Sequence, residues 1–405
     1  MDICETYSDR KLFCNDWEFY KAAFGSDYSE NFAFKPVDIP HDWLIYNTND
    51  LYETFTGWYR KNFSYQKKEG IRTFIRFDGV YMDSKVYVNG TLAGEWKYGY
   101  SAFMFDITDL VKDGENVVTV RVDHHAPNSR WYSGAGIFRK VWLCESPEIR
   151  FGNDGIYITT SKDEDGWQVT VKAEMLRPVG TPLGGIRIRN TIFDKDGKEA
   201  ASYESDACGA DISCIPEAVR VKGVSYSLTA QTMTVKDPEL WDIASPVLYT
   251  MVSEILVDGG CVQRVSQKFG FRTIKFKCDS GFYLNGRHVK LHGSCEHHDN
   301  GCLGAVSNPA AIRRRFKKLR KMGINAIRTS HNMPAEEFMD IADETGMLIL
   351  SEGFDMWERS KTDYDYARFF DEWVEKDVAS WVRRDRNRPS IIGWSVGNEI
   401  FDTHA

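Results

Sequence analysis

The chain has 405 residues, too many for one hydrophobic core, and this length predicts roughly two to four domains. Hydrophobic residues make up 42% and aromatic residues 14% of the chain, which is enough to fill globular cores. The net charge is −8 with both signs intermixed, and no basic stripe is present to neutralise phosphates. We therefore expect no nucleic-acid partner.

Nine cysteines are scattered along the chain without a Cys-x-x-Cys pair. This pattern is typical of reduced thiols rather than of a disulfide framework or a zinc ribbon. The first residues, 1–13, lack the apolar core of a signal peptide, and no apolar run is long enough to cross a membrane. The sequence thus predicts a cytoplasmic protein without a membrane partner.

Residues 1–147 are expected to form an all-β domain, which Pro147 closes. Asn89-Gly90 directly follows one strand-like run and is a strong signal for a two-residue hairpin. The spacing of the runs is typical of a jelly-roll sandwich. The 12 Trp and 19 Tyr of the whole chain either fill β-sandwich cores or line a sugar- or nucleobase-binding surface, and both readings stay open. The strand-like runs cover 57–63, 72–77, 84–88, 117–122 and 140–143.

Residues 148–277 continue with strand-like runs separated by Asp/Gly turns such as 194–197. Their length and strand spacing predict an immunoglobulin-like β-sandwich of about a hundred residues. The clearest runs are 155–159, 167–171 and 186–189.

Residues 278–405 change to an alternation of strands and helices, and Gly323 is expected to end the first helix. Alternation at this pace predicts right-handed parallel units, here the first half of a (β/α)8 TIM barrel with two open edges. The chain would then stop in the middle of this barrel. We expect strands at 289–292, 325–328, 347–350 and 391–396, and helices at 309–322, 335–345 and 368–384.

Polar residues follow each of these four strands, and in a parallel barrel such residues converge at one mouth. Each of the four strand ends carries an imidazole or a carboxylate group, which makes the joint pattern more informative than any single residue. Glu399 follows the last strand and is our first catalytic candidate. The four strand ends are 296–299, 328–332, 351–357 and 398–399.

Several short motifs occur in a characteristic order: 39–43, 57–60, 77–80, 88–90, 131–139, 297–299, 325–331, 384–390 and 397–399. Together they resemble glycoside hydrolase family 2, which contains β-galactosidases, β-glucuronidases and β-mannosidases. The resemblance covers essentially the whole sequence but reaches only the middle of the family's catalytic barrel. Segments 352–357 and 364–368 look most like the β-galactosidase branch.

The resemblance implies retaining hydrolysis of a terminal β-D-galactoside, which needs two carboxyl groups about 5–5.5 Å apart. Glu399 matches the family's acid/base, and Asn398 matches the amide that binds the sugar 2-hydroxyl. The family's nucleophile lies on a later strand, and no residue of this chain corresponds to it. We therefore expect little activity from the chain alone. By spacing alone Glu352 could be the second carboxylate, but it more readily orients Arg328 or holds substrate hydroxyls.

The other substrate-binding candidates are also implied by the resemblance. His297 and His331 match histidines that contact sugar hydroxyls, whereas Arg328 is expected to pair with carboxylates in the pocket floor. His298 and Asp299 are candidates for the same site, although a capping or supporting role explains them equally well. The loop of the first domain that reaches the sugar pocket contributes Arg130 and Trp131.

No metal ligand is assigned, since sequential loop histidines rarely all face one point. Magnesium or sodium in the full-length enzyme is possible by resemblance, but Met356 stands where a ligating glutamate is expected. A full-length enzyme is also expected to be a homo-oligomer. Three alternatives remain: a β-glucuronidase, a non-catalytic fragment that binds carbohydrate or complements a missing half, and a degenerate pseudoenzyme.

Overall fold

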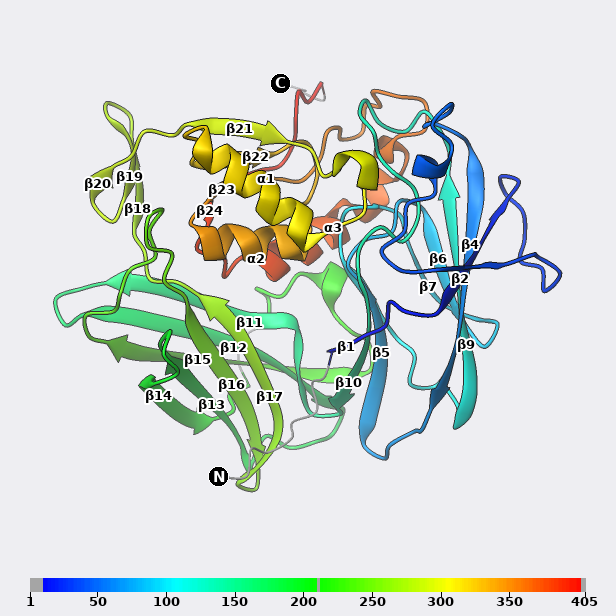
Figure 1. The fold of residues 1–405 in the computed structure, drawn as a ribbon. Coiled ribbons are helices and arrows are strands. Elements are labelled where there is room, and N and C mark those ends of the chain that lie inside the picture. Colours follow the sequence, from blue (N-terminus) through cyan, green and yellow to red (C-terminus); the bar gives the residue numbers. More distant parts are fainter. Residues whose placement is uncertain (1–9, 210–211, 402–405) are drawn as a thin grey trace.

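The structure, a computed structural model, describes residues 10–209 and 212–401. Figure 1 shows two β-sandwiches and a parallel α/β part, coloured yellow to red, that packs against both of them. The predicted multidomain architecture of two sandwiches and a partial TIM barrel is confirmed. Within the described residues, none of the helices is long and apolar enough to span a membrane.

The first sandwich combines a six-stranded sheet of order β3-β2-β4-β9-β6-β7 with a four-stranded sheet of order β1-β10-β5-β8. Asn89 adopts a left-handed conformation, with φ of 51°, between β6 and β7, as the predicted hairpin requires. The strands are β1 (Arg10–Leu12), β2 (Trp17–Ala22), β3 (Lys35–Val37), β4 (Phe55–Tyr65), β5 (Ile71–Phe77), β6 (Ser84–Val88), β7 (Thr91–Trp96), β8 (Phe103–Asp106), β9 (Gly114–His124) and β10 (Val141–Pro147), and the short 3-10 helix η1 covers Leu44–Tyr46.

The second sandwich has sheets of order β11-β12-β15 and β14-β13-β16-β17, all antiparallel. Its core contains Trp167, Phe269 and Phe271, whose rings pack edge to face or tilted. The elements are β11 (Arg150–Lys162), β12 (Trp167–Pro178), β13 (Ile186–Phe193), β14 (Glu199–Asp206), β15 (Val224–Val235), β16 (Tyr249–Val257) and β17 (Gly260–Phe269), and η2 covers Glu217–Val219.

The α/β part contains a parallel sheet of order β21-β22-β23-β24. Asn308 caps the first helix, because its side chain accepts hydrogen bonds from the backbone N–H groups of Ala310 and Ala311. The elements are β18 (Ile274–Lys277), β19 (Gly281–Leu284), β20 (Arg287–His288), β21 (Gly293–Glu296), β22 (Ala326–Thr329), β23 (Leu348–Glu352), β24 (Ile391–Ser395), α1 (Pro309–Lys321), α2 (Glu336–Thr345), α3 (Phe370–Asp385), η3 (Gly301–Leu303) and η4 (Tyr366–Phe369).

One predicted strand was wrong. The first strand of the parallel sheet is 293–296, not 289–292, because Val289 is buried below the sheet and donates its N–H to Phe282 O. Asn325 fixes the shifted start: its side chain accepts from His292 N at 2.8 Å and donates to Lys290 O at 3.0 Å. The strand consequently ends directly before the loop that carries His297.

The two faces of the parallel sheet have different neighbours. On the helix side, Ile327 and Ile349 pack with apolar residues of α1 and α2. At the end away from the carboxyl ends of the strands, the opposite face is covered by the β18–β20 hairpin and by Trp241 of the second sandwich. Trp241 is fully buried, and its indole N–H donates to Asp343 O at 2.8 Å. The carboxyl ends of the strands therefore remain the accessible end of the sheet.

The first sandwich packs against the α/β part through a mixed aromatic cluster. Tyr98, Tyr100 and Phe138 from the sandwich share this cluster with Phe354 and with residues of α3. The Tyr98 hydroxyl also donates to Gly353 O at 2.6 Å. This contact holds the loop after β23 against the sandwich and so brings two parts of the chain to one mouth.

Candidate active site

The mouth is formed by the segments that follow β21, β22, β23 and β24, together with the sandwich loop that carries Arg130 and Trp131. An ion pair between neighbouring strands forms its floor. Arg328 at the end of β22 donates to both carboxylate oxygens of Glu352 at the end of β23, from Nε and Nη2 at 2.9 Å each. Glu352 also accepts from Ser395 Oγ at 2.8 Å. Because its side chain is 1% exposed, Glu352 is held in one orientation.

His331 is oriented by the same carboxylate. Its Nδ1 lies 2.7 Å from Glu352 Oε1 and donates a hydrogen bond to this carboxylate. Burial raises the pKa of Glu352, but hydrogen bonds from His331, Ser395 and Arg328 outweigh it and leave that pKa below its usual value. Glu352 is therefore an anion that organises its neighbours.

Asn398 connects this floor to a second buried carboxylate. Its Oδ1 accepts from Arg328 Nη2 at 2.6 Å, and its Nδ2 donates to Asp355 Oδ1 at 2.8 Å. Lys361 donates to Asp355 at 3.1 Å and to the backbone carbonyl of Asn398 at 2.6 Å. Burial raises the pKa of Asp355, yet its bonds to Arg130, Asn398 and Lys361 lower it overall.

Arg130 reaches into the mouth from the first sandwich. Its guanidinium makes two bonds to Asp355, from Nε at 3.1 Å and from Nη2 at 2.6 Å, and Nη1 lies 3.3 Å from Glu399 Oε2. Glu399 has a left-handed backbone, with φ of 46°, which is uncommon outside glycine and concentrates at functional sites. Its side chain is 65% exposed and directed toward the Arg130 end of the network.

Trp131 and two histidines form an aromatic group beside this network. The Trp131 ring lies 5.3 Å from the ring of His297 and 5.7 Å from that of His331, and the two imidazoles meet edge to face at 5.4 Å. Burial lowers the pKa of His297. Its buried Nδ1 has no hydrogen-bond partner among the described residues.

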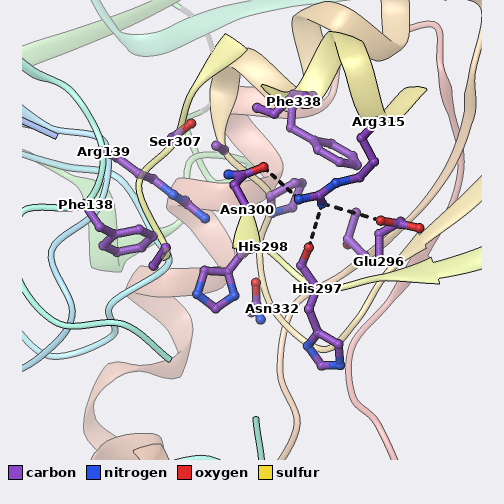
Figure 2. Close-up of a pocket in the computed structure, with 15 residues that line it drawn as sticks. Phe138, Arg139, Glu296, His297, His298, Asn300, Ser307, Arg315, Asn332 and Phe338 are labelled. Carbon is purple, nitrogen blue, oxygen red and sulfur yellow. Dashed lines mark hydrogen bonds and ion pairs between the residues drawn. The ribbon is translucent and has the colours of Figure 1, made fainter. Parts of the chain in front are cut away.

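His298 and Asp299 lie apart from these contacts. The ring of His298 packs against Tyr100 and Phe138, and its Nε2 donates to Ser133 O at 2.9 Å. Burial lowers the pKa of His298 to about 4, so it is a neutral group inside the domain contact. Figure 2 shows its ring on the side of Phe138, away from the ring of His297. Asp299 Oδ2 accepts a long bond from Gly301 N, which places it in a loop turn.

Arg315 of α1 holds the loop that carries these histidines. Its guanidinium donates to the backbone oxygens of His297 and Asp299 and, at 2.7 Å, to Asn300 Oδ1 (Figure 2). The enclosed space there is about 30 Å³, room for about one water molecule. In the sequence, Arg315 is only one of several basic residues in the predicted helix 309–322, so its supporting role was missed.

The described residues do not fit a metal near Glu399. Met356 is 5% exposed within the aromatic cluster, where it packs with groups such as Phe354 and Tyr366. In residues 10–209 and 212–401, no group of three or more His, Cys, Asp or Glu side chains is arranged to hold an ion.

Family comparisons agree with this arrangement. Residues 29–147 match the family model described as "Glycosyl hydrolases family 2, sugar binding domain", residues 153–272 match "Glycosyl hydrolases family 2", and residues 275–404 match "Glycosyl hydrolases family 2, TIM barrel domain". The three matches follow one another along nearly the whole chain.

Similar proteins point the same way. A β-galactosidase of Bacteroides ovatus is 40% identical over 97% of this chain and 47% of its own length, and a β-glucuronidase of Bacteroides fragilis is 29% identical over 90% of this chain and 53% of its own length. The chain thus spans about half the length of these curated relatives. A crystal structure of a family 2 glycosyl hydrolase from Bacteroides cellulosilyticus superposes with a TM-score of 0.86 at 33% identity, covering 97% of this chain and 52% of that one. The chain belongs to glycoside hydrolase family 2.

Proposed function

We propose that this chain supplies the acid/base side of the active site of a retaining β-glycosidase that acts on terminal β-D-galactosides. The observation that carries the proposal is the continuous network of Glu352, Arg328, Asn398, Asp355 and Arg130, which ends at Glu399. This network includes a carboxyl group and an amide that follow parallel strands, two imidazoles lie beside it, and barrel enzymes carry their chemistry at such strand ends.

In this proposal Glu399 protonates the glycosidic oxygen and later activates water. The amide of Asn398 is tied on both sides, so it can present a fixed dipole to the 2-hydroxyl of the sugar. The imidazoles of His331 and His297, which lie edge to face beside Trp131, are suited to contact other sugar hydroxyls.

The second carboxylate of a double displacement is not offered by this network. Both oxygens of Glu352 are occupied by Arg328, His331 and Ser395, and Asp355 is enclosed by Arg130, Lys361 and Asn398. Neither group is free to attack a sugar carbon. The nucleophile would have to come from outside the described residues, so we expect very low turnover by this chain alone.

The charges at the mouth favour a neutral sugar over a glucuronide. Arg328 is paired with Glu352, and Arg130 and Lys361 are both paired with Asp355. A sugar carboxylate would have to compete with these bonds for a cation, at a desolvation cost. For this reason the galactoside is our first choice, and the β-glucuronidase is the alternative.

A chimera tests the proposal: this chain is fused to the C-terminal part of the B. ovatus β-galactosidase and assayed with aryl β-galactosides and β-glucuronides. We expect galactoside turnover, and Glu399→Ala should lower kcat about 10²–10⁴-fold on a substrate with a poor leaving group. With an activated leaving group, added azide should restore turnover of Glu399→Ala, because azide needs no general base. Full activity of Glu399→Ala with the poor leaving group would refute the role. A preference for the glucuronide would replace the substrate assignment.

A further inference from the structure

A second cavity, of about 510 Å³, lies at the edge of the first sandwich. It is lined by the start of β2 at Trp17, by Val37 of β3, by the segment 40–46 and by Val306 of the α/β part. None of the residues of the mouth lines it. Its volume falls in the range of small-molecule sites, which are typically about 300–1,000 Å³.

Four hydrogen bonds to the carboxylate of Asp42 hold the lining of this cavity in place without a ligand. Its Oδ1 accepts from the backbone N–H groups of Leu44 and Ala135 at 3.1 and 3.0 Å. Its Oδ2 accepts from the Tyr132 hydroxyl at 2.6 Å and from Ala305 N at 2.9 Å. The last contact ties the sandwich loop to the residue before Val306, so little ordering would be needed on binding.

A tyrosine ring stands at the rim. Tyr46, the last residue of η1, is 75% exposed and stacks on the ring of His41 with centroids 5.7 Å apart and planes at 30°. His41 is buried, and its Nδ1 lies 2.7 Å from the Tyr59 hydroxyl. Burial lowers the pKa of His41 to about 4, so the support under Tyr46 is uncharged at neutral pH. An amphipathic ring held in this way is suited to stack on a flat apolar surface of a ligand.

The charged groups of the cavity narrow the ligand class. The exposed carboxylates of Asp16 and Asp38 line it, and none of its described lining residues is Lys or Arg. Carboxylates accept hydrogen bonds from hydroxyl groups and repel anions. A metal ion is disfavoured as well, since nowhere in the described part of the chain do three or more ligating side chains gather.

We infer that this cavity binds a neutral saccharide, whose ring stacks on Tyr46 and whose hydroxyl groups donate to Asp16 and Asp38. The site goes beyond the proposed hydrolysis and does not depend on it. It would hold carbohydrate to the first sandwich while the mouth acts on a separate sugar.

The test uses the 405-residue chain labelled with 3-fluorotyrosine, in which the ¹⁹F resonances of Tyr46 and Tyr52 are assigned through Y46F and Y52F. Tyr52 is the matched control, because it is 52% exposed and does not line the cavity. Methyl β-D-galactopyranoside and methyl β-D-glucopyranoside are titrated, with D-glucuronate as the charged probe. We expect at least one neutral sugar to shift the Tyr46 resonance saturably, with a dissociation constant on the order of 1 mM, while Tyr52 does not respond.

Three further results are expected. Asp38→Ala should weaken the binding seen at Tyr46 at least fivefold, D-glucuronate should bind at least fivefold more weakly than the neutral sugar, and Trp131→Ala at the mouth should change the affinity less than twofold. A Tyr46 resonance that stays unchanged up to about 50 mM of both neutral sugars would overturn the inference. Equal shifts of Tyr46 and Tyr52, or tighter binding of D-glucuronate, would overturn it as well. None of these outcomes depends on whether the mouth hydrolyses galactosides.

Discussion

Asp377 of α3 is a fully buried carboxyl group where the first sandwich meets the α/β part. It accepts hydrogen bonds from Ser101 Oγ, from Trp96 Nε1 at 2.9 Å and from the Tyr366 hydroxyl. Burial raises its pKa to about 7 in spite of these three donors. The neighbouring ammonium of Lys376 lies over the Trp373 ring, 4.1 Å from its centroid. Asp377→Asn keeps the size and most hydrogen bonds of the side chain but cannot ionise.

The pKa of Asp377 rises from an ordinary value of 3.8 to about 7 on folding, so the folded chain binds a proton that the unfolded chain has released. The stabilising contribution of this proton is complete below pH 3.8 and is lost as the pH rises through 7. A difference of about three units corresponds to about 4 kcal/mol of unfolding free energy, a large fraction of a typical domain's stability. Relative to Asp377→Asn, the wild type should lose about 1.4 kcal/mol per pH unit between pH 5 and 7.

Urea unfolding of wild type and Asp377→Asn between pH 5 and 9 measures this difference, in the first transition if several are seen. Subtracting the two curves cancels the other titrating groups. Asp371→Asn, at an exposed position of the same helix, serves as the control and should differ from wild type by an amount that does not change with pH. A difference between wild type and Asp377→Asn that is independent of pH, or a wild type that is the more stable protein at pH 8, would refute the reasoning.

Three other substitutions test the site and the packing of Trp241 under the parallel sheet. Glu352→Gln leaves Arg328 without its counter-ion beside a buried position and should lower the unfolding free energy by about 2–4 kcal/mol, measured by urea unfolding at pH 7. Arg130→Ala should lower kcat/KM of the galactosidase chimera at least tenfold, with Arg130→Lys partly active; an unchanged kcat/KM would exclude a role for this side chain in holding Glu399. Trp241→Ala should cost about 3–5 kcal/mol, because it opens a cavity under the sheet. A loss of unfolding free energy below about 1 kcal/mol would mean that the β18–β20 hairpin covers this end of the sheet without Trp241.

Much of the fold follows from local patterns in the sequence. Asn89-Gly90 predicted its hairpin correctly, because few residues tolerate the left-handed conformation that this turn requires. The helix at 309–322 was predicted within one residue of its observed end, where Gly323 stops it. The first barrel strand was misplaced because Val289 looks like a strand residue in isolation. Its burial depends on the β18–β20 hairpin and on Trp241, which no local pattern reveals.

The site was only partly predictable for a similar reason. Arg328, His331, Glu352 and Asn398 follow parallel strands, so topology alone brings them to one end of the sheet. Asp355 lies in the segment 351–357 that follows the third strand, but its central position emerges only from its four hydrogen-bond donors. Lys361 and Arg315 gave no signal in the sequence, because their partners are reached through loop and helix geometry.

The contact between the first sandwich and the α/β part decides whether this mouth exists at all. Arg130 and Trp131 belong to a sandwich loop, which the Tyr81 hydroxyl fixes through Asn128 Oδ1 at 2.9 Å and the Trp131 indole fixes through the Tyr100 hydroxyl at 3.1 Å. If the sandwich separates, Glu399 and Asp355 lose their guanidinium partner together. Asp377 lies in the same contact, so its ionisation should loosen the site as well as the fold. We therefore expect the packing of the first sandwich on the α/β part and the assembly of the mouth to be coupled, so that an alkaline pH weakens both.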